Sequence, residues 1–392
     1  MAGSLEAELP RPLPGRARAW LLAALFGAFF LSAGVLLALW AWMVAASWPH
    51  SEPDGDPAWG INFSCNYAEY LMLEEPGGAD VPDDRPGRVA WCAATLGRLL
   101  DRTGAGDVRL SVEWSEVEPR EGEFDFRLTD GLLQEAERRG VRVLLTVGMK
   151  GQRHPEYYLP GWLTRGLELP WGAAVDREPR VAEAALRMID AVVRHTSASA
   201  AVDSWGADNE PLVTSPRASR WSISPEFVAR EVAAIRAADQ RGRPVVVNHA
   251  EVMAWFSGWD TALALGDVLG FSLYPFRNVP LPGLTIVVPV LELGPLIVNL
   301  PYYAGRARDE GKDFWITEMQ AEPWFTGDPR LASPASPAAN LSPGRLAENL
   351  RYARRSGASR VYLWGAEWWL FQEERFGDSR WIDLGRSVLD GP

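Results

Sequence analysis

Residues 181–211 read VAEAALRMIDAVVRHTSASAAVDSWGADNEP, and this stretch contains the repeating unit from which we predict the fold. From Val181 to His195, apolar residues recur at the spacing of an amphipathic helix. From Val202 to Asp208 the chain forms a short β-rich run that ends in a polar Asp-Asn-Glu-Pro turn. A helix followed by a short buried strand is typical of a parallel sheet whose strands are connected by helices.

The same alternation recurs along the chain. The strand candidates are Trp59–Phe63, Val108–Glu113, Val141–Val147, Val202–Asp208, Pro244–Asn248, Val268–Tyr274, Phe314–Glu318 and Arg360–Trp364. The helical patterns are Arg88–Thr103, Leu128–Arg139, Val181–His195, Pro225–Arg241, Trp255–Leu265, Tyr303–Asp309 and Arg345–Ser356. Gly140, Gly242 and Gly311 follow three of these helices, as expected of helix C-terminal stops. The sequence therefore predicts an α/β protein with a (β/α)8 TIM barrel over residues 58–392.

The composition restricts the partners of the barrel. The 392 residues carry a net charge of −12, which disfavours a nucleic-acid partner because phosphate binding needs a basic surface. The four histidines show no ligand pair and two cysteines cannot form a four-cysteine zinc site, so we expect no metal and no cofactor. Whether Cys65 and Cys92 form a disulfide stays open, because the bond requires an oxidising compartment.

A second element precedes the barrel. Residues 19–48 contain no charged side chain, and this length exceeds the roughly 20 residues that span a bilayer. We interpret them as a transmembrane signal-anchor helix between a cytoplasmic tail (residues 1–18) and a linker (residues 49–57). The alternative is a cleaved signal peptide, because Ala45, Ala46 and Ser47 offer small residues at a cleavage site.

The flanking charges predict how the helix is oriented. Arg11, Arg16 and Arg18 precede it, whereas Glu52, Asp54 and Asp56 follow it. The positive-inside rule then places the N-terminus in the cytoplasm and the barrel outside, in a single-pass protein of the cell membrane. A second apolar stretch, Val279–Tyr303, is interrupted by five prolines. We expect it to form a loop and a buried helix of the barrel wall, the alternative being a surface that contacts lipid.

Two glutamates stand where barrel enzymes carry their chemistry, at the C-terminal ends of strands. Glu210 follows the predicted fourth strand and Glu318 ends the seventh, and these strands face each other across a closed barrel. Glycoside hydrolysis needs two carboxyl groups that flank the scissile bond. Glu113 and Glu116 compete for these roles, but one strand alone cannot place a pair on opposite sides of that bond.

With these residues in place, the chain over roughly residues 59–383 resembles the clan A glycoside hydrolases, which include cellulase-like and β-galactosidase-like barrels. The resemblance rests on Asn209-Glu210 after strand four, on Glu318 in strand seven, and on the stretch VRLSVEW (108–114) in strand two. It implies a retaining mechanism, in which Glu210 is the acid/base and Glu318 the nucleophile.

The resemblance also implies roles for the neighbours of the two glutamates. Arg109 and Tyr274 would hold Glu318 ionised, Asn209 would contact a sugar hydroxyl, and Trp364 would lie under the sugar. His249 is a further substrate-contact candidate. The alternatives for these residues are structural: a salt bridge for Arg109, a turn for Asn209, core packing for Tyr274, and for His249 a polar residue that is merely satisfied by hydrogen bonds.

The predicted function is hydrolysis of O-glycosidic bonds in a carbohydrate outside the cytoplasm, a polysaccharide, oligosaccharide or glycoconjugate. Three alternatives stay open. The first is a transglycosylase that uses the same two glutamates, and the second is a catalytically silent barrel that binds a glycan. The third, a metal-dependent hydrolase, is disfavoured by the histidine content.

Overall fold

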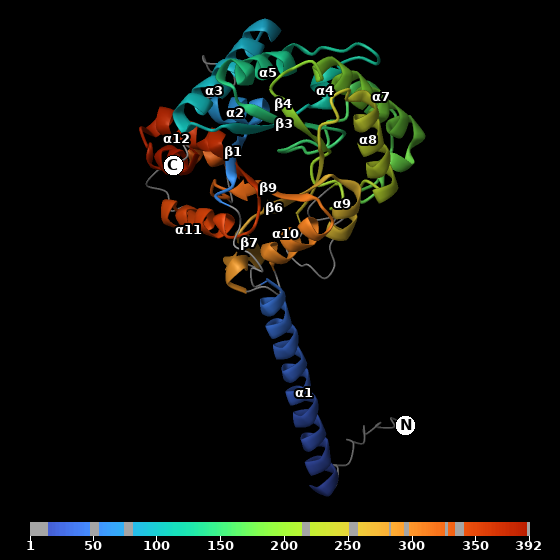
Figure 1. Cartoon of the computed structure of the whole chain (residues 1–392), viewed down its shortest axis with the longest axis vertical. Coiled ribbons are helices and arrows are strands. Elements are labelled where there is room, and N and C mark those ends of the chain that lie inside the picture. The colour runs from blue at the N-terminus through green and yellow to red at the C-terminus, as the bar shows by residue number, and fades with distance from the viewer. Residues whose placement is uncertain are drawn as a thin grey trace, which may run out of the picture. The chain divides into compact units, whose positions relative to one another are not determined.

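The computed structural model describes residues 15–47, 55–73, 81–213, 220–250, 258–281, 284–293, 298–325, 328–333 and 341–389. It divides into an N-terminal helical unit (residues 1–48) and a barrel unit (residues 49–392). Figure 1 shows the helices of the second unit arranged around its strands.

Eight parallel strands close into a barrel, as predicted. They are β1 (Ala58–Asn62), β2 (Asp107–Ser111), β3 (Arg142–Val147), β4 (Val202–Ala207), β5 (Val245–His249), β6 (Val268–Leu273), β9 (Asp313–Gln320) and β10 (Arg360–Trp364). Their order around the barrel is β1-β10-β9-β6-β5-β4-β3-β2. Because every neighbouring pair is parallel, the C-terminal ends of all eight strands meet at one end, which becomes the barrel mouth.

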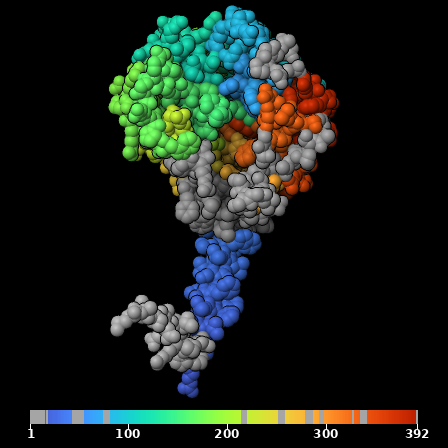
Figure 2. Space-filling model, turned by 180° about the vertical axis from the view of Figure 1, so that it is seen from behind, coloured from blue at the N-terminus to red at the C-terminus, as the bar shows by residue number. Residues whose placement is uncertain are grey.

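The helices of the barrel unit are α2 (Cys65–Met72), α3 (Arg85–Thr103), α4 (Trp114–Val117), α5 (Arg127–Arg139), α6 (Gly161–Thr164), α7 (Pro179–Thr196), α8 (Pro225–Ala238), α9 (Trp259–Leu265), α10 (Leu300–Asp309), α11 (Pro343–Arg354), α12 (Ala366–Phe376) and α13 (Arg380–Leu389). All seven predicted helices are present, although residues 255–257 lie outside the described residues. In Figure 2, green atoms of the segment between β3 and α8 gather on one side of the barrel, and orange and red atoms from α10 onward gather on the other.

Local capping explains where several helices begin and end. The side chains of Asp84 and Ser224 accept bonds from the backbone N–H groups that open α3 and α8. Gly140 adopts a left-handed conformation and ends α5, as predicted. The prediction that α8 reaches Arg241 is wrong, because Asp239 caps the helix after Ala238 and its carboxylate accepts the Arg243 backbone N–H at 2.7 Å.

The second apolar stretch differs from the prediction in its first half. Phe276–Leu281 (β7) pairs with Leu284–Pro289 (β8) in an antiparallel hairpin, where a loop and a buried helix were expected. The Thr-Ile-Val-Val run at residues 285–288 explains the difference, because β-branched residues favour extended backbone. The expected helix begins only at Leu300. Ile286 in the hairpin is exposed, and contact with lipid stays a prediction.

The N-terminal unit is a single helix, α1 (Gly15–Ser47). Its span Ala19–Trp42 is long and apolar enough to cross a membrane. The 24 residues extend about 36 Å at 1.5 Å per residue, which exceeds the roughly 30 Å of a hydrocarbon core. Large side chains such as Trp20, Phe29 and Leu31 are exposed, so this helix offers an apolar surface that suits lipid. Its length and position fit either a membrane anchor or a signal sequence.

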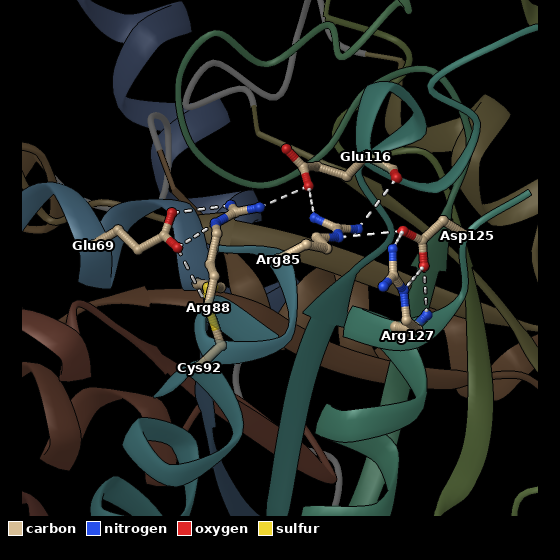
Figure 3. Close-up of polar contacts among 8 residues, drawn as sticks. Glu69, Arg85, Arg88, Cys92, Glu116, Asp125 and Arg127 are labelled. Carbon is tan, nitrogen blue, oxygen red and sulfur yellow. Dashed lines mark hydrogen bonds and ion pairs between the residues drawn. A yellow bond between two sulfur atoms is a disulfide. The ribbon is translucent and has the colours of Figure 1, made fainter. Parts of the chain in front are cut away.

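A disulfide and an ion-pair network join the segments after β1 and β2 (Figure 3). Cys65 at the start of α2 is bonded to Cys92 in α3, with their Cα atoms 5.5 Å apart. Beside this bond, Arg88 donates to Glu69 and, at 2.7 Å, to Glu116, so one guanidinium connects α2 to α4. The open question of the disulfide is therefore answered: the two cysteines are paired.

We predict that replacing both cysteines, Cys65→Ser with Cys92→Ser, lowers the free energy of unfolding by about 3 kcal/mol, because the bond closes a loop of intermediate length. Urea unfolding with and without reductant measures this. Reductant should destabilise the wild type by a similar amount and leave the double variant unchanged. Equal stability of the two proteins under oxidising conditions contradicts the prediction.

Candidate active site

Glu210 lies in an unusual turn directly after β4. Both Asp208 (φ 55°) and Glu210 (φ 48°) adopt left-handed backbone conformations, which non-glycine residues rarely take. Two backbone bonds hold the turn to the segment after β3, from Asp208 to Val147 (2.8 Å) and from Asn209 to Lys150 (2.8 Å). Strain of this kind persists where the surroundings over-determine it, and it is common at functional sites.

The neighbouring strands complete this turn. Gly148 leaves the space for Asp208, since a Cβ atom there would lie 2.0 Å from the Asp208 carboxylate. That carboxylate accepts the backbone N–H of Lys150 at 2.7 Å. The backbone N–H of Glu210 donates to the side chain of Asn248, on β5, at 2.9 Å. Backbone groups on both sides therefore fix Glu210, and its own side chain is half-buried.

Glu318 lies on β9, and its carboxylate is bonded at both oxygens. Arg109 from β2 donates through Nη1 to Oε1 at 2.7 Å, and the hydroxyl of Tyr274 donates to Oε2. Glu318 and Arg109 are 2% and 1% exposed, so the ion pair has almost no contact with bulk solvent. The two donors that the resemblance implied thus contact the expected carboxylate.

Asn209 is linked to Glu318 through the same arginine. Its Oδ1 accepts from Arg109 Nη2 at 2.7 Å and from Asn248 Nδ2 at 3.2 Å. Because the oxygen is the acceptor of both bonds, the NH2 end of the amide must point away from Arg109. Arg109 therefore orients Asn209 and Glu318 with one planar guanidinium.

The charges of the two glutamates interact. Burial and the nearby Glu210 carboxylate raise the pKa of Glu318 to about 7, whereas Arg109 and Tyr274 act in the opposite direction. Burial also raises the pKa of the Tyr274 hydroxyl, followed by the effect of Glu318, so Tyr274 stays a donor at neutral pH. Arg109 and Tyr274 favour the charged form of Glu318, as expected, but burial outweighs them.

The other predicted contacts lie in different surroundings. Trp364 is 7% exposed, and the guanidinium of Arg153 lies 4.0 Å from the centre of its ring. His249 is fully buried, and neither ring nitrogen has a hydrogen-bond partner among the described residues. Burial lowers the pKa of His249 to about 4, with a further contribution from Lys150, so its imidazole is neutral at pH 7. Its contact with substrate stays a prediction.

Arg153 is the centre of a polar cluster that the sequence reasoning missed. It lies between the rings of Trp364 and Tyr67, and it forms ion pairs with Glu322 and, at 3.0 Å, with Glu367. These carboxylates follow β9 and β10, so the rule that selected Glu210 and Glu318 also applies to them. Arg153 itself lies in a long loop after β3 and carries no such signal.

Glu113 and Glu116 are not part of the network around Glu318. Glu116 is paired with Arg85 and Arg88 in the outer cluster of Figure 3. Burial raises the pKa of Glu113 to about 8, with a smaller contribution from Glu116, so Glu113 is largely neutral at pH 7. Glu113 and Glu116 therefore lie apart from Glu318, whose pKa is raised by the charge of Glu210.

The raised pKa of Glu318 predicts a pH-dependent stability. An ordinary glutamate titrates near pH 4.5, so between about pH 4.5 and 7 the native chain holds a proton that the unfolded chain has lost. The stabilisation of the native state by this proton is complete below pH 4.5 and is lost as the pH rises through 7. Relative to a Glu318→Gln variant, the wild type should lose up to about 3 kcal/mol over this window. Urea unfolding at several pH values measures the difference, and a constant difference contradicts the prediction.

The matched family and the solved relatives agree on the kind of barrel. The family model described as Beta-galactosidase (Glyco_hydro_42) matches residues 97–221, from α3 to just beyond β4. This segment contains Arg109, Asn209 and Glu210 but ends before the strand of Glu318. No curated protein matches the chain.

Solved structures share the fold at low sequence identity. A GH5_18 protein from Bifidobacterium longum subsp. infantis has a TM-score of 0.54 at 13% identity, over 86% of this chain and 80% of that protein. A GH5_18 variant from Streptomyces cattleya, in complex with Manb1-4GlcNAc, has a TM-score of 0.51 at 14% identity, over 79% and 70%. An exo-beta-1,4-mannosidase from Opitutaceae bacterium strain TAV5 has a TM-score of 0.51 at 17% identity, over 86% and 60%.

The closed eight-stranded barrel is the fold of these proteins, and the family match covers its second to fourth strands. The chain is therefore similar to glycoside hydrolases in two respects: residues 97–221 match a glycoside hydrolase family, and the barrel has the fold of the solved relatives.

Proposed function

We propose that this protein is a retaining glycoside hydrolase in which Glu318 is the nucleophile and Glu210 the acid/base. The observation that carries the proposal is the setting of Glu318, a buried carboxylate bonded by Arg109 and Tyr274 with the Glu210 charge close by. For stability alone, apolar residues of similar volume would serve as well as a buried ion pair. A function that needs the charge explains why the barrel carries it.

In the first proposed step a carboxylate oxygen of Glu318 attacks the anomeric carbon. The bond from that carbon to the leaving oxygen breaks, and Glu210 transfers its proton to this oxygen. Arg109 and Tyr274 hold the attacking carboxylate in place, which reduces the reorganisation that the reaction needs.

In the second step Glu210, now a carboxylate, removes a proton from water as the water oxygen attacks the same carbon. The ester to Glu318 breaks, and the product keeps the configuration of the substrate. Asn209 directs its NH2 end away from Arg109, and we assign this donor to the sugar hydroxyl beside the reacting carbon. Trp364, held from one side by Arg153, is the platform that we propose for the sugar.

The first substrates to test are β-linked hexosides. The family description names β-galactosidase, and the relatives of similar fold include a β-1,4-mannosidase and a protein solved with Manb1-4GlcNAc. We propose an oligosaccharide, polysaccharide or glycoconjugate that contains such a sugar.

We propose that the barrel works outside the cytoplasm, anchored to the cell membrane by α1. The Cys65–Cys92 disulfide supports this placement, because such bonds persist in oxidising compartments and are rare in the cytosol. The apolar span Ala19–Trp42 supports the anchor, and the arginines before it support a cytoplasmic N-terminus.

Substitution of the two glutamates tests the mechanism. Glu318→Gln should lower kcat at least about 10⁴-fold, because no covalent intermediate forms. Glu210→Ala should lower kcat/KM by about 10²- to 10⁴-fold on substrates with poor leaving groups. The loss should be much smaller for dinitrophenyl glycosides, because dinitrophenolate is a leaving group that needs no proton.

Azide should restore turnover of Glu210→Ala and yield a glycosyl azide of retained configuration, identified by NMR. Glu113→Gln is the matched control, because it replaces a half-buried carboxyl that is largely neutral at pH 7. Unchanged activity of Glu318→Gln, or products of inverted configuration, refutes the assignment. Products formed with excess sugar acceptor distinguish transglycosylation from hydrolysis.

Fractionation tests the placement. The full chain expressed in a bacterial host should remain in the membrane fraction after a carbonate wash, with its barrel accessible to protease from the outer face. A chain starting at residue 49 should be released from the membrane. Recovery of the intact full chain in the soluble cytoplasmic fraction, with both thiols reactive, contradicts the proposal.

A further inference from the structure

The barrel unit has a pocket with a volume of about 680 Å³, which we call the Trp171 pocket. It lies between the long loop after β3 and the segment after β4. The aromatic and polar residues of its wall include His154, Glu156, Tyr157, Trp171, Arg220 and Trp221. This volume is within the range of about 300 to 1,000 Å³ that is typical of small-molecule sites.

The wall of the pocket is held by bonds between its two segments. The backbone of Gly172 donates to Arg220 at 2.8 Å, and that of Val175 donates to Ser222 at 2.9 Å. The indole of Trp221 is buried, donates to the carbonyl of Leu169, and meets Tyr157 edge to face with ring centres 5.2 Å apart. The buried aromatic residues at the base of the pocket are therefore held in place by these contacts.

One side of the pocket is linked to the proposed acid/base. The Glu156 carboxylate, which lines it, lies 3.4 Å from the ammonium of Lys150. That ammonium donates to the backbone carbonyl of Glu210 at 3.2 Å. Burial raises the pKa of Glu156, and the Glu210 charge adds to the rise, so the two carboxylates are close enough to interact.

The acid/base transfers its proton to the leaving oxygen, so the leaving group must lie on the Glu210 side of the scissile bond. The Trp171 pocket is linked to Glu210 through Glu156 and Lys150. Trp364, whose ring meets Tyr274 at 6.3 Å and Arg153 at 4.0 Å, does not line this pocket. The platform that we propose for the cleaved sugar and the Trp171 pocket are therefore separate groups of residues.

The exposed groups of the pocket suit a sugar. Trp171 is 67% exposed, and exposed indole surface stacks well on the C–H face of a pyranose ring. Around it the carboxylate of Glu156, the imidazole of His154 and the guanidinium of Arg220 offer acceptors and donors for hydroxyl groups. An apolar aglycone would leave these polar groups without partners, which disfavours it.

Resting on the proposed mechanism, we infer that the Trp171 pocket binds the sugar residue on the leaving-group side of the scissile bond. The natural substrate is then a glycan in which the cleaved sugar is linked to at least one further pyranose. Cleavage of such a bond depends on Trp171, whereas cleavage of a substrate without a sugar leaving group does not.

The test compares two kinds of substrate for the same donor sugar. The probes are the β-fluorides of galactose, mannose and glucose, and the β-1,4-linked disaccharide of each. Trp171→Ala should lower kcat/KM on the cleaved disaccharide about ten- to a hundredfold and change the value on the fluoride less than twofold. Trp171→Phe, which keeps an aromatic face, should retain most of the disaccharide activity. Phe376→Ala, another exposed aromatic residue, is the control for a surface substitution without effect.

The outcomes separate this inference from the proposed mechanism. Equal losses on fluoride and disaccharide in Trp171→Ala, or no loss on either, overturn the pocket assignment and leave the mechanism intact. If the wild-type enzyme cleaves a fluoride but none of the disaccharides, the pocket assignment is likewise overturned and the mechanism is left intact. A wild-type enzyme that cleaves none of the six probes refutes the proposed mechanism, and the pocket assignment with it.

Discussion

The buried ion pair between Arg109 and Glu318 is the interaction on which the rest of the site depends. Two opposite charges at 2.7 Å, almost without solvent contact, are tolerated only if their remaining polar atoms are also bonded. Tyr274 bonds the second carboxylate oxygen, and Asn209 accepts the second guanidinium N–H. The requirement to satisfy one buried pair thus brings together residues from two strands, β2 and β9, and from the segments directly after two others, β4 and β6.

The turn after β4 meets a different requirement, since a carboxyl group must leave the strand and face the mouth. Two left-handed residues, Asp208 and Glu210, reverse the backbone sharply enough to do this. The turn is stable because the end of β3 and the loop after it supply Gly148 and two backbone acceptors, and β5 supplies Asn248. Glu210 is therefore held by its backbone, while its side chain stays half-buried and able to reach a substrate.

Two polar clusters that follow the strands differ in chemistry. In one, Arg153 with Glu322 and Glu367 forms a compact charged group against the rings of Tyr67 and Trp364. In the other, Lys150 and Glu156 connect Glu210 to a pocket with an exposed indole. Such asymmetry suits a reaction in which the two sugars beside the broken bond have different roles. It also shows how long loops on a closed barrel specialise one end of a common fold.

The sequence alone determined the elements that depend on local periodicity and composition. The eight barrel strands, seven of the helices and the apolar span near the N-terminus were predictable, because hydrophobic spacing is a local property. The strand-end rule also located Glu210 and Glu318. The hairpin of β7 and β8, and the ends of α8, depended on pairing and capping that a periodic pattern does not encode.

Only the tertiary structure decided which polar residues meet. Arg153 and Lys150 lie on the loop after β3, where the sequence carries no periodicity, and their partners lie far along the chain. His249 occupies a strand end like the catalytic candidates, yet it is fully buried. The physical reason is that burial and hydrogen bonding between distant segments depend on closure of the barrel, which no local stretch of sequence contains.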